Sequence, residues 1–241
     1  MRPAKTQSLD CWENHLNKPA RKVVKPAPPR TVRLLNLRGV LPRPVEAESK
    51  LEADFVRQAA LSRVVRAITA QAFRLPVSPK GYVPDFLLDT LHDQPMVVEV
   101  KLDGKVDEYR RLFDRAAACL AERRMTFAVA TEKTIRNVRL HERAALILRY
   151  AKAVYPIVDK DSVVDCVGST KQGLPMGALL KKTKLTRHLI LHLIAHKALT
   201  TGSRLSLDDS AVVSLPVIHT EMSDEIQLAR WLGVAPWPKN A

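Results

Sequence analysis

Three charged residues lie close together in the sequence, on either side of a short polar loop. Asp85 follows Pro84, and Glu99 and Lys101 belong to an apolar stretch that contains three valines. A hairpin centred near residue 92 pairs positions whose numbers sum to about 184, so it places Asp85 opposite Glu99 with β-carbons about 5 Å apart. Facing carboxylates repel each other, so this arrangement favours a bridging cation or a shared proton.

The ligand types indicate which cation fits. Carboxylate oxygens without a histidine partner favour a hard ion, magnesium or manganese, over zinc or copper. Strand side chains alternate, so Glu99 and Lys101 share one face, and Val98, Val100 and Leu102 are predicted to point into the core. The Lys101 ammonium would hold an attacking water or stabilise charge on a phosphorane-like transition state. The spacing therefore permits metal-assisted phosphodiester hydrolysis.

An upstream helix, predicted to begin near Val45, supplies further carboxylates. Its apolar residues recur at three- and four-residue spacing, which places Glu48 and Glu52 on one face. Glu52 is the preferred metal ligand or orienting residue, because it lies between the core residues Leu51 and Phe55. Glu48 lies nearer the frayed helix start. The choice between the two glutamates stays open.

The order of the other elements predicts an α/β fold. The predicted strands are residues 63–73, 82–88, 96–102 and 126–130. An amphipathic helix at 106–120 separates the last two strands, and residues 131–153 are predicted to be helical. A strand, a long helix and another strand suggest a crossover, so we expect a mixed sheet covered by helices.

Composition divides the chain into three predicted parts. Residues 1–44 form a basic, proline-rich arm, either ordered on binding phosphate or protein, or a solvated tail. Residues 45–156 form the α/β domain. Residues 157–241 form a smaller, mainly helical domain, in which helices at 176–182, 186–199 and 224–232 and a β-like pair at 203–217 are compatible with a winged-helix unit.

The charge of the chain indicates a polyanionic partner. The formal net charge is +14, from 39 basic and 25 acidic residues. Nucleic acid is the leading candidate and an acidic membrane surface the second. Residues 166–207 contain seven Lys or Arg and no acidic residue, which suggests phosphate contact, docking to an acidic protein, or a merely solvated basic face.

Hydropathy and cysteine spacing limit the remaining classes of protein. The sequence has no run of about 18 apolar residues and no signal-peptide pattern, so we expect a cytoplasmic, nucleoid-associated protein that does not span a membrane. Its three cysteines are far apart, which argues against a disulfide framework and a cysteine-rich zinc site.

These motifs together resemble a known family. Pro84-Asp85 followed by Glu99-Val100-Lys101, with the upstream Glu52, resembles the PD-(D/E)xK superfamily of restriction-endonuclease-like nucleases. The wider context looks like TnsA, the endonuclease subunit of heteromeric cut-and-paste DNA transposases. That context comprises residues 48–52 with Phe55, Gln71, residues 82–86, residues 98–101 and residues 131–136. The resemblance covers roughly residues 30–150.

The resemblance implies a fold, a site and partners. It implies a catalytic set of Glu52, Asp85, Glu99 and Lys101, with magnesium bound by the three carboxylates. It also implies hydrolysis of the non-transferred 5′ strands at the transposon ends, beside an integrase-type transposase subunit that processes the 3′ ends. The carboxy-terminal domain would be winged-helix-like and would dock onto the transposase or onto an ATP-dependent transposition regulator. Gln71 is followed by Ala72 where the family would have proline, so no role is assigned to Gln71.

Two other functions fit the same residues. One is a stand-alone restriction- or repair-type nuclease, which would cut plain duplex DNA without partners. The other is a non-catalytic nucleic-acid-binding scaffold, in which the charged hairpin is a solvated salt-bridge ladder. Metal binding separates the scaffold from both nucleases, and activity without partners separates the two nucleases.

Overall fold

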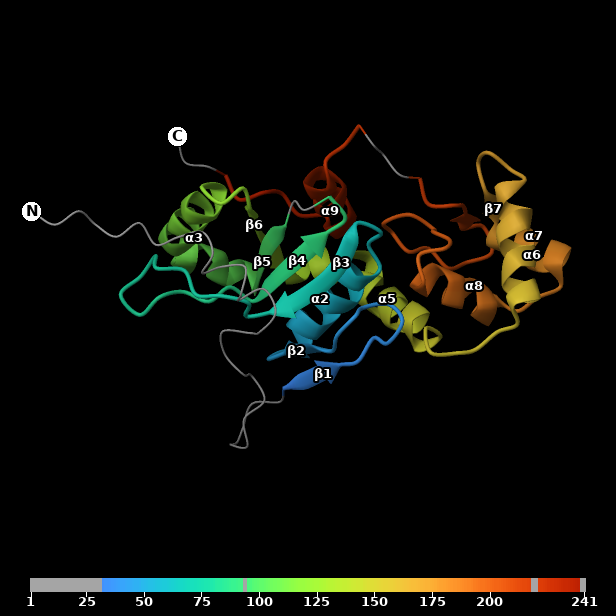
Figure 1. Cartoon of the computed structure of the whole chain (residues 1–241), viewed down its shortest axis with the longest axis horizontal. Helices are drawn as coiled ribbons and strands as arrows, with labels where there is room; N and C mark the ends of the chain where they lie inside the picture. Colours follow the sequence, from blue (N-terminus) through green and yellow to red (C-terminus); the bar gives the residue numbers. More distant parts are fainter. Residues whose placement is uncertain (1–31, 93–94, 218–220, 239–241) are drawn as a thin grey trace, which may run out of the picture.

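The chain folds as a mixed α/β protein around a four-stranded sheet that has helices on both faces (Figure 1). The computed structural model describes residues 32–92, 95–217 and 221–238. A second group of helices lies beside the sheet, on the right in Figure 1.

The sheet has the mixed topology that the sequence predicts. It contains β3 (Val65–Ala70), β4 (Phe86–Thr90), β5 (Met96–Lys101) and β6 (Thr126–Thr131), in that order. The β3–β4 and β4–β5 pairs are antiparallel, whereas β5 and β6 are parallel. Phe86 pairs with Val98, so the register of the hairpin matches the predicted one.

One face of the sheet is covered by the crossover helix. The chain passes from β5 through a short 3-10 turn, η1 (Asp103–Lys105), into α3 (Val106–Ala121) and then into β6. The apolar side of α3 buries Phe113 and Leu120 in a cluster with Val97. A parallel pair needs such a connection, and the amphipathic pattern of α3 turns its apolar side toward the strands.

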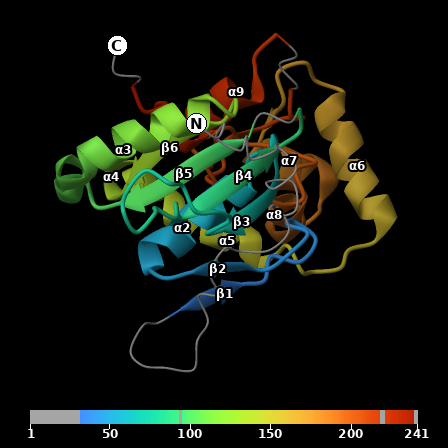
Figure 2. The ribbon, with the colours of Figure 1, turned by 60° about the vertical axis from the view of Figure 1, so that its left-hand side comes forward.

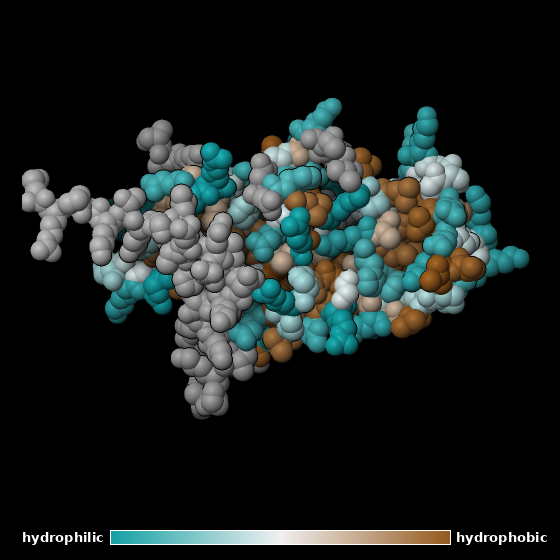
Figure 3. All heavy atoms as spheres, viewed as in Figure 1, coloured by the Kyte–Doolittle hydropathy of each residue, from teal (hydrophilic) through white to brown (hydrophobic). Residues whose placement is uncertain are grey.

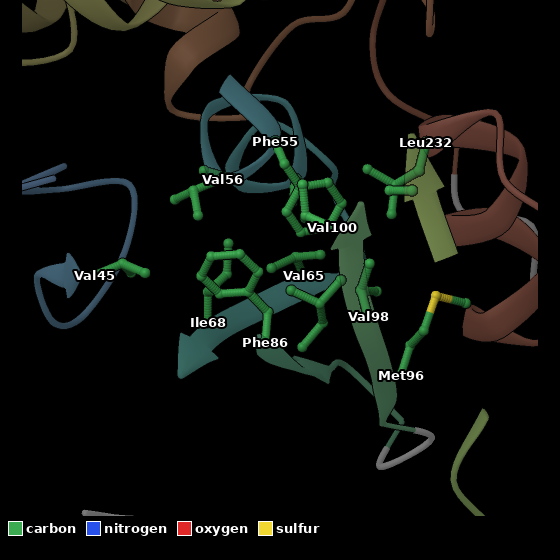
Figure 4. Packing of buried hydrophobic residues seen from close by; sticks show 14 of the residues in the cluster. Val45, Phe55, Val56, Val65, Ile68, Phe86, Met96, Val98, Val100 and Leu232 are labelled. Carbon is green, nitrogen blue, oxygen red and sulfur yellow. The ribbon is translucent and has the colours of Figure 1, made fainter. Parts of the chain in front are cut away.

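The opposite face packs on α2 (Lys50–Ala60) (Figure 4). Phe55 of α2 stacks on Phe86 of β4 with ring centroids 5.5 Å apart. Val98 lies in this same cluster, whereas its neighbour Val97 lies in the cluster under α3. Glu99 therefore has the parity of Val97 and faces the α3 side. Leu102 lies beyond the strand and is 56% exposed, so its predicted place in the core is wrong.

The segment before α2 is extended. β1 (Arg33–Leu35) and β2 (Val45–Ala47) pair antiparallel, and α2 begins only at Lys50, after the N-cap residue Ser49. A helical start at Val45 is therefore wrong, because the apolar residues of this short strand imitate helical spacing. Residues 1–31, most of the predicted arm, lie outside the described residues.

The helical segment after β6 is broken into pieces. α4 (Glu132–Ile135), η2 (Asn137–Arg139) and α5 (Leu140–Arg149) replace the single helix predicted over 131–153. Val138 and Arg139 have left-handed backbone angles, with φ of 41° and 61°. Such angles interrupt helical hydrogen bonding, so α5 takes a new direction and packs on both α2 and α8.

The helices beside the sheet form a second core with α5. They are α6 (Ile157–Gly168), α7 (Met176–Thr183) and α8 (Arg187–Ala195). Two short strands, β7 (Leu174–Pro175) and β8 (Val212–Val213), pair antiparallel, and a bridge joins Thr200 to Ser214. The β-like pair predicted within 203–217 is therefore wrong, because β8 finds its partner before α7.

The last helix, α9 (Asp224–Leu232), buries its apolar residues mainly in the first core, and its Trp231 packs against both cores. Leu228 and Leu232 are buried in the cluster that contains Val98 of β5, and Figure 4 shows Leu232 close to β5. At the start of α9, Asp224 accepts a hydrogen bond of 2.7 Å from the backbone of His92. Beyond α9, Trp237 packs edge-on against Phe113 of α3. The carboxy-terminal segment thus closes over the sheet.

The surface is a mixture of residue types. Figure 2, turned by 60°, separates α3 and α6, which lie at opposite sides of the sheet. Hydrophobic residues alternate with hydrophilic ones across the face drawn in Figure 3. Among the described residues, no helix has the length and apolar character needed to cross a bilayer.

Candidate active site

Asp85 lies at the end of the sheet where β4 begins and β5 ends. It precedes the first β4 residue, Phe86, and its Oδ2 accepts a hydrogen bond of 2.8 Å from the backbone N–H of Val100. The Asp85 carboxylate thus takes the place of a ladder partner and points at β5. The predicted proximity of Asp85 to Glu99 follows from this bond, although Asp85 itself lies just outside the paired strand.

Glu99 is held by two neighbours. It is 4% exposed, its Oε1 lies 2.8 Å from the Lys101 ammonium, and its Oε2 accepts a bond of 2.6 Å from the Tyr82 hydroxyl. Lys101 also lies 4.6 Å from the centroid of the Tyr109 ring on α3. Glu99 and Lys101 therefore share one face of β5, as the alternation predicts, and their side chains are fixed by packing.

Glu52 reaches the same region from the first turn of α2. Its backbone N–H donates a hydrogen bond of 3.0 Å to the Ser49 hydroxyl. Its Oε2 accepts a hydrogen bond of 2.7 Å from the backbone N–H of Glu48. Glu48 lies before the helix, so the two glutamates do not share a helical face as predicted. Glu52 also has a capping role, because it satisfies a donor at the helix start.

Gln71, to which the sequence assigns no role, contacts two parts of the site. Its backbone N–H donates a hydrogen bond of 2.8 Å to the carbonyl of Asp85. Its side-chain Nε2 donates one of 3.2 Å to Oε1 of Glu48. Its φ is 49°, an unusual value for a residue other than glycine. Gln71 therefore fixes the backbone that carries Asp85 and positions Glu48, a function that does not require proline at residue 72.

The carboxylates destabilise each other's charges. Desolvation raises the pKa of Asp85 well above its usual range, and repulsion from Glu99 and Glu52 raises it further. Burial likewise raises the pKa of Glu52, with smaller contributions from Glu48 and Glu99. Three acids and one lysine carry a formal charge of −3 + 1 = −2, which a divalent cation would balance.

Lys101 keeps its proton. Desolvation lowers the pKa of its ammonium, but the attraction and hydrogen bond of Glu99 outweigh this effect, and the pKa is raised. The Tyr82 hydroxyl also stays protonated, because burial and the neighbouring carboxylates raise its pKa. Lys101 is thus suited to electrostatic stabilisation rather than to proton abstraction, and Tyr82 to donating a hydrogen bond.

No family model and no curated protein sequence matches the chain. The site is therefore interpreted from its own geometry.

The donor set has the chemistry that magnesium requires. Asp85, Glu99 and Glu52 supply hard oxygen atoms, and their mutual repulsion is the property that cation binding would relieve. Among the residues that the structure describes, no three acidic, histidine or cysteine groups are already arranged around an ion position. Both Glu99 oxygens contact Lys101 and Tyr82, so binding would require adjustment of these side chains.

Tyr82 is expected to position Glu99 for metal binding. The Tyr82→Phe substitution keeps the ring beside Phe113 but removes the donor to Glu99. We expect the affinity for manganese to fall by about 10- to 100-fold, the usual effect of losing a hydrogen bond that orients a ligand. Calorimetric titration measures this effect, with Tyr155→Phe as the matched control. Unchanged metal affinity would remove Tyr82 from the site.

Proposed function

We propose that the chain is a magnesium-dependent DNA endonuclease, the subunit of a heteromeric transposase that cuts the 5′, non-transferred strands at transposon ends. The convergence of Asp85, Glu99 and Lys101 at one end of the sheet carries this proposal. The net charge of +14 supports nucleic acid as the substrate. The transposase context is supported by the motif resemblance alone.

The side chains have separate roles in the proposed hydrolysis. Asp85, Glu99 and Glu52 would hold the ion. Bound magnesium would supply a water of lowered pKa and neutralise phosphate charge. The Lys101 ammonium would stabilise negative charge on the phosphoryl oxygens, and the Val100 N–H holds the Asp85 carboxylate in its orientation.

The second core is proposed to be a winged-helix-like domain. Its order is α6, β7, α7, α8, the isolated bridge residue Thr200 and β8, that is, helix, strand, helix, helix, bridge, strand. This order and the acid-free basic stretch over residues 166–207 support contact with DNA phosphates. The domain is also proposed to dock onto the integrase-type transposase or the ATP-dependent regulator.

A cleavage assay with partner proteins tests this function. The full chain is incubated with magnesium and end-labelled duplex carrying a transposon end, alone and with an integrase-type transposase subunit. We expect 5′-strand cleavage that needs both magnesium and the partner. The Glu99→Gln variant should be inactive, whereas Glu142→Gln, a change at an exposed α5 position, should leave cleavage unchanged.

The other outcomes of the assay decide between the alternatives. Robust cleavage of plain duplex by the chain alone would favour a stand-alone restriction- or repair-type nuclease. Absence of metal-dependent cleavage both with and without the partner would contradict the endonuclease proposal and favour a binding scaffold.

A further inference from the structure

A cavity lies at the end of the sheet opposite to the carboxylates. It has a volume of about 340 Å³. Its lining comes from segments that are distant in sequence: residues 61–64 before β3, residues 194–203 around the end of α8, residues 214–217 after β8, and residues 222–231 at and within α9. We call it the Lys197 cavity. A volume above about 300 Å³ is sufficient for a small ligand.

The charges that line the Lys197 cavity are all positive. Arg63, Lys197 and Arg230 contribute three cations, and no acidic residue is among the described residues of the lining. Within the described part of the chain, none of the three lies within 4.0 Å of a carboxylate oxygen. The described residues therefore bring positive charge together from separate segments and supply no carboxylate within ion-pair distance of it.

Lys197 is the most constrained of these cations. Its ammonium donates a hydrogen bond of 2.6 Å to the carbonyl of Val65, the first residue of β3. Its backbone has a φ of 61°, a left-handed conformation that glycine or asparagine usually adopts at this position after a helix. Desolvation alone lowers the pKa of Lys197 to about 8. The lysine is thus still protonated at neutral pH, in a place where water does not fully solvate it.

The other lining groups favour a phosphate. Arg63 donates to the carbonyl of Pro216, which holds the guanidinium at the cavity wall. The hydroxyl-bearing residues Ser62, Thr200 and Ser214 also line the cavity. Guanidinium, ammonium and hydroxyl donors together match the several acceptor oxygens of a phosphate, and Trp231 supplies an adjacent aromatic wall.

We propose that the Lys197 cavity binds a phosphate monoester, carried by a mononucleotide or by the phosphorylated end of a DNA strand. The site is independent of the proposed hydrolysis. β3 starts at the cavity and ends at Ala70, next to Gln71 of the carboxylate site, and six strand residues separate the two sites by roughly 20 Å.

Binding of defined phosphate compounds tests the proposal with the full chain. The probes are inorganic phosphate, dAMP, and one oligodeoxynucleotide with either a 5′-phosphate or a 5′-hydroxyl, titrated calorimetrically without divalent ions. We expect dAMP to bind with a dissociation constant below about 1 mM. We expect the Lys197→Met/Arg230→Gln double variant to lose at least about tenfold in affinity, because it removes two charged donors. Lys181→Met, an exposed lysine change on α7, is the control and should bind as the wild type does.

The probes also identify the source of the phosphate. Equal affinity for both oligonucleotide forms, with binding of dAMP, assigns the cavity to free nucleotides. A preference of tenfold or more for the 5′-phosphate form assigns it to strand ends. Two results would overturn the proposal: no binding of any phosphate monoester at about 10 mM, or equal affinity of the double variant and the wild type. The melting temperature of each variant is measured as well, because Lys197→Met removes the hydrogen bond to the Val65 carbonyl, and binding is compared only at temperatures at which every variant is folded.

Discussion

Replacing Asp85 with asparagine is expected to lower the rate of metal-dependent DNA cleavage by about a thousandfold, because this change removes a carboxylate charge needed to hold the ion. The same change should stabilise the metal-free protein. The Asp85 carboxylate is desolvated and repelled by Glu99 and Glu52, and asparagine removes its charge while it can still accept the hydrogen bond from Val100. We expect the free energy of unfolding without metal to rise by about 1 kcal/mol.

Two measurements check this prediction together. Single-turnover cleavage gives the rate, and urea unfolding in a chelating buffer gives the stability. Asp161→Asn, an exposed change on α6, serves as the matched control and should alter neither. Lower activity accompanied by lower stability would indicate that Asp85 supports the fold rather than the chemistry.

Replacing Lys101 with methionine is expected to separate catalysis from metal binding. The cleavage rate should fall by about 100- to 1000-fold, the usual cost of losing a group that stabilises transition-state charge. Metal affinity should change by less than about threefold. Loss of a group that orients a metal ligand would instead lower the affinity by about 10- to 100-fold. The expected change is small because removing the ammonium frees Oε1 of Glu99, which Lys101 contacts at 2.8 Å.

A second substitution at Lys101 distinguishes a loss of catalysis from a loss of folding. Loss of Lys101 leaves the buried Glu99 carboxylate with Tyr82 as its one remaining side-chain partner among the described residues, and this costs stability. Lys101→Arg retains the charge and should fold as the wild type does, with a smaller loss of rate. If Lys101→Met abolished metal binding while Lys101→Arg preserved it, Lys101 would be a structural support of the site instead of a catalytic group.

The sequence predicts the core of the site because its spacing rules are local. The register of the β4–β5 hairpin follows from a short loop and an apolar strand, and this register brings Asp85 to Val100 of β5, between Glu99 and Lys101. The crossover through α3 is predictable for the same reason, since its amphipathic pattern is long and uninterrupted.

The positioning residues could not be predicted in this way. Tyr82 and Gln71 act through contacts to residues 17 and 23 positions away, respectively, and no periodicity signals such contacts. The left-handed φ of Gln71 has no sequence signature either, because the residue is not glycine. A buried tyrosine hydroxyl needs a hydrogen-bond partner, and this general requirement is a signal that could have pointed to Tyr82.

Long-range packing also decides how the carboxy-terminal segment is arranged. The apolar residues of α9 predict a helix but do not indicate which core it joins. Leu228 packs in the hydrophobic cluster between the sheet and α2. The indole N–H of Trp231 donates a hydrogen bond of 2.9 Å to the carbonyl of Gln58 on α2. These contacts place α9 between the two cores, where it forms one wall of the Lys197 cavity.

Manganese titration of the purified chain by calorimetry tests the central claim most directly, because the claim is that the carboxylates at the end of the sheet hold a divalent cation. We expect saturable binding by the wild type and by Asp161→Asn. Binding should be weakened by at least about 100-fold in Asp85→Asn and Glu99→Gln, each of which loses a ligand charge. Binding of equal strength in all four proteins, or no binding to the wild type, would contradict the account.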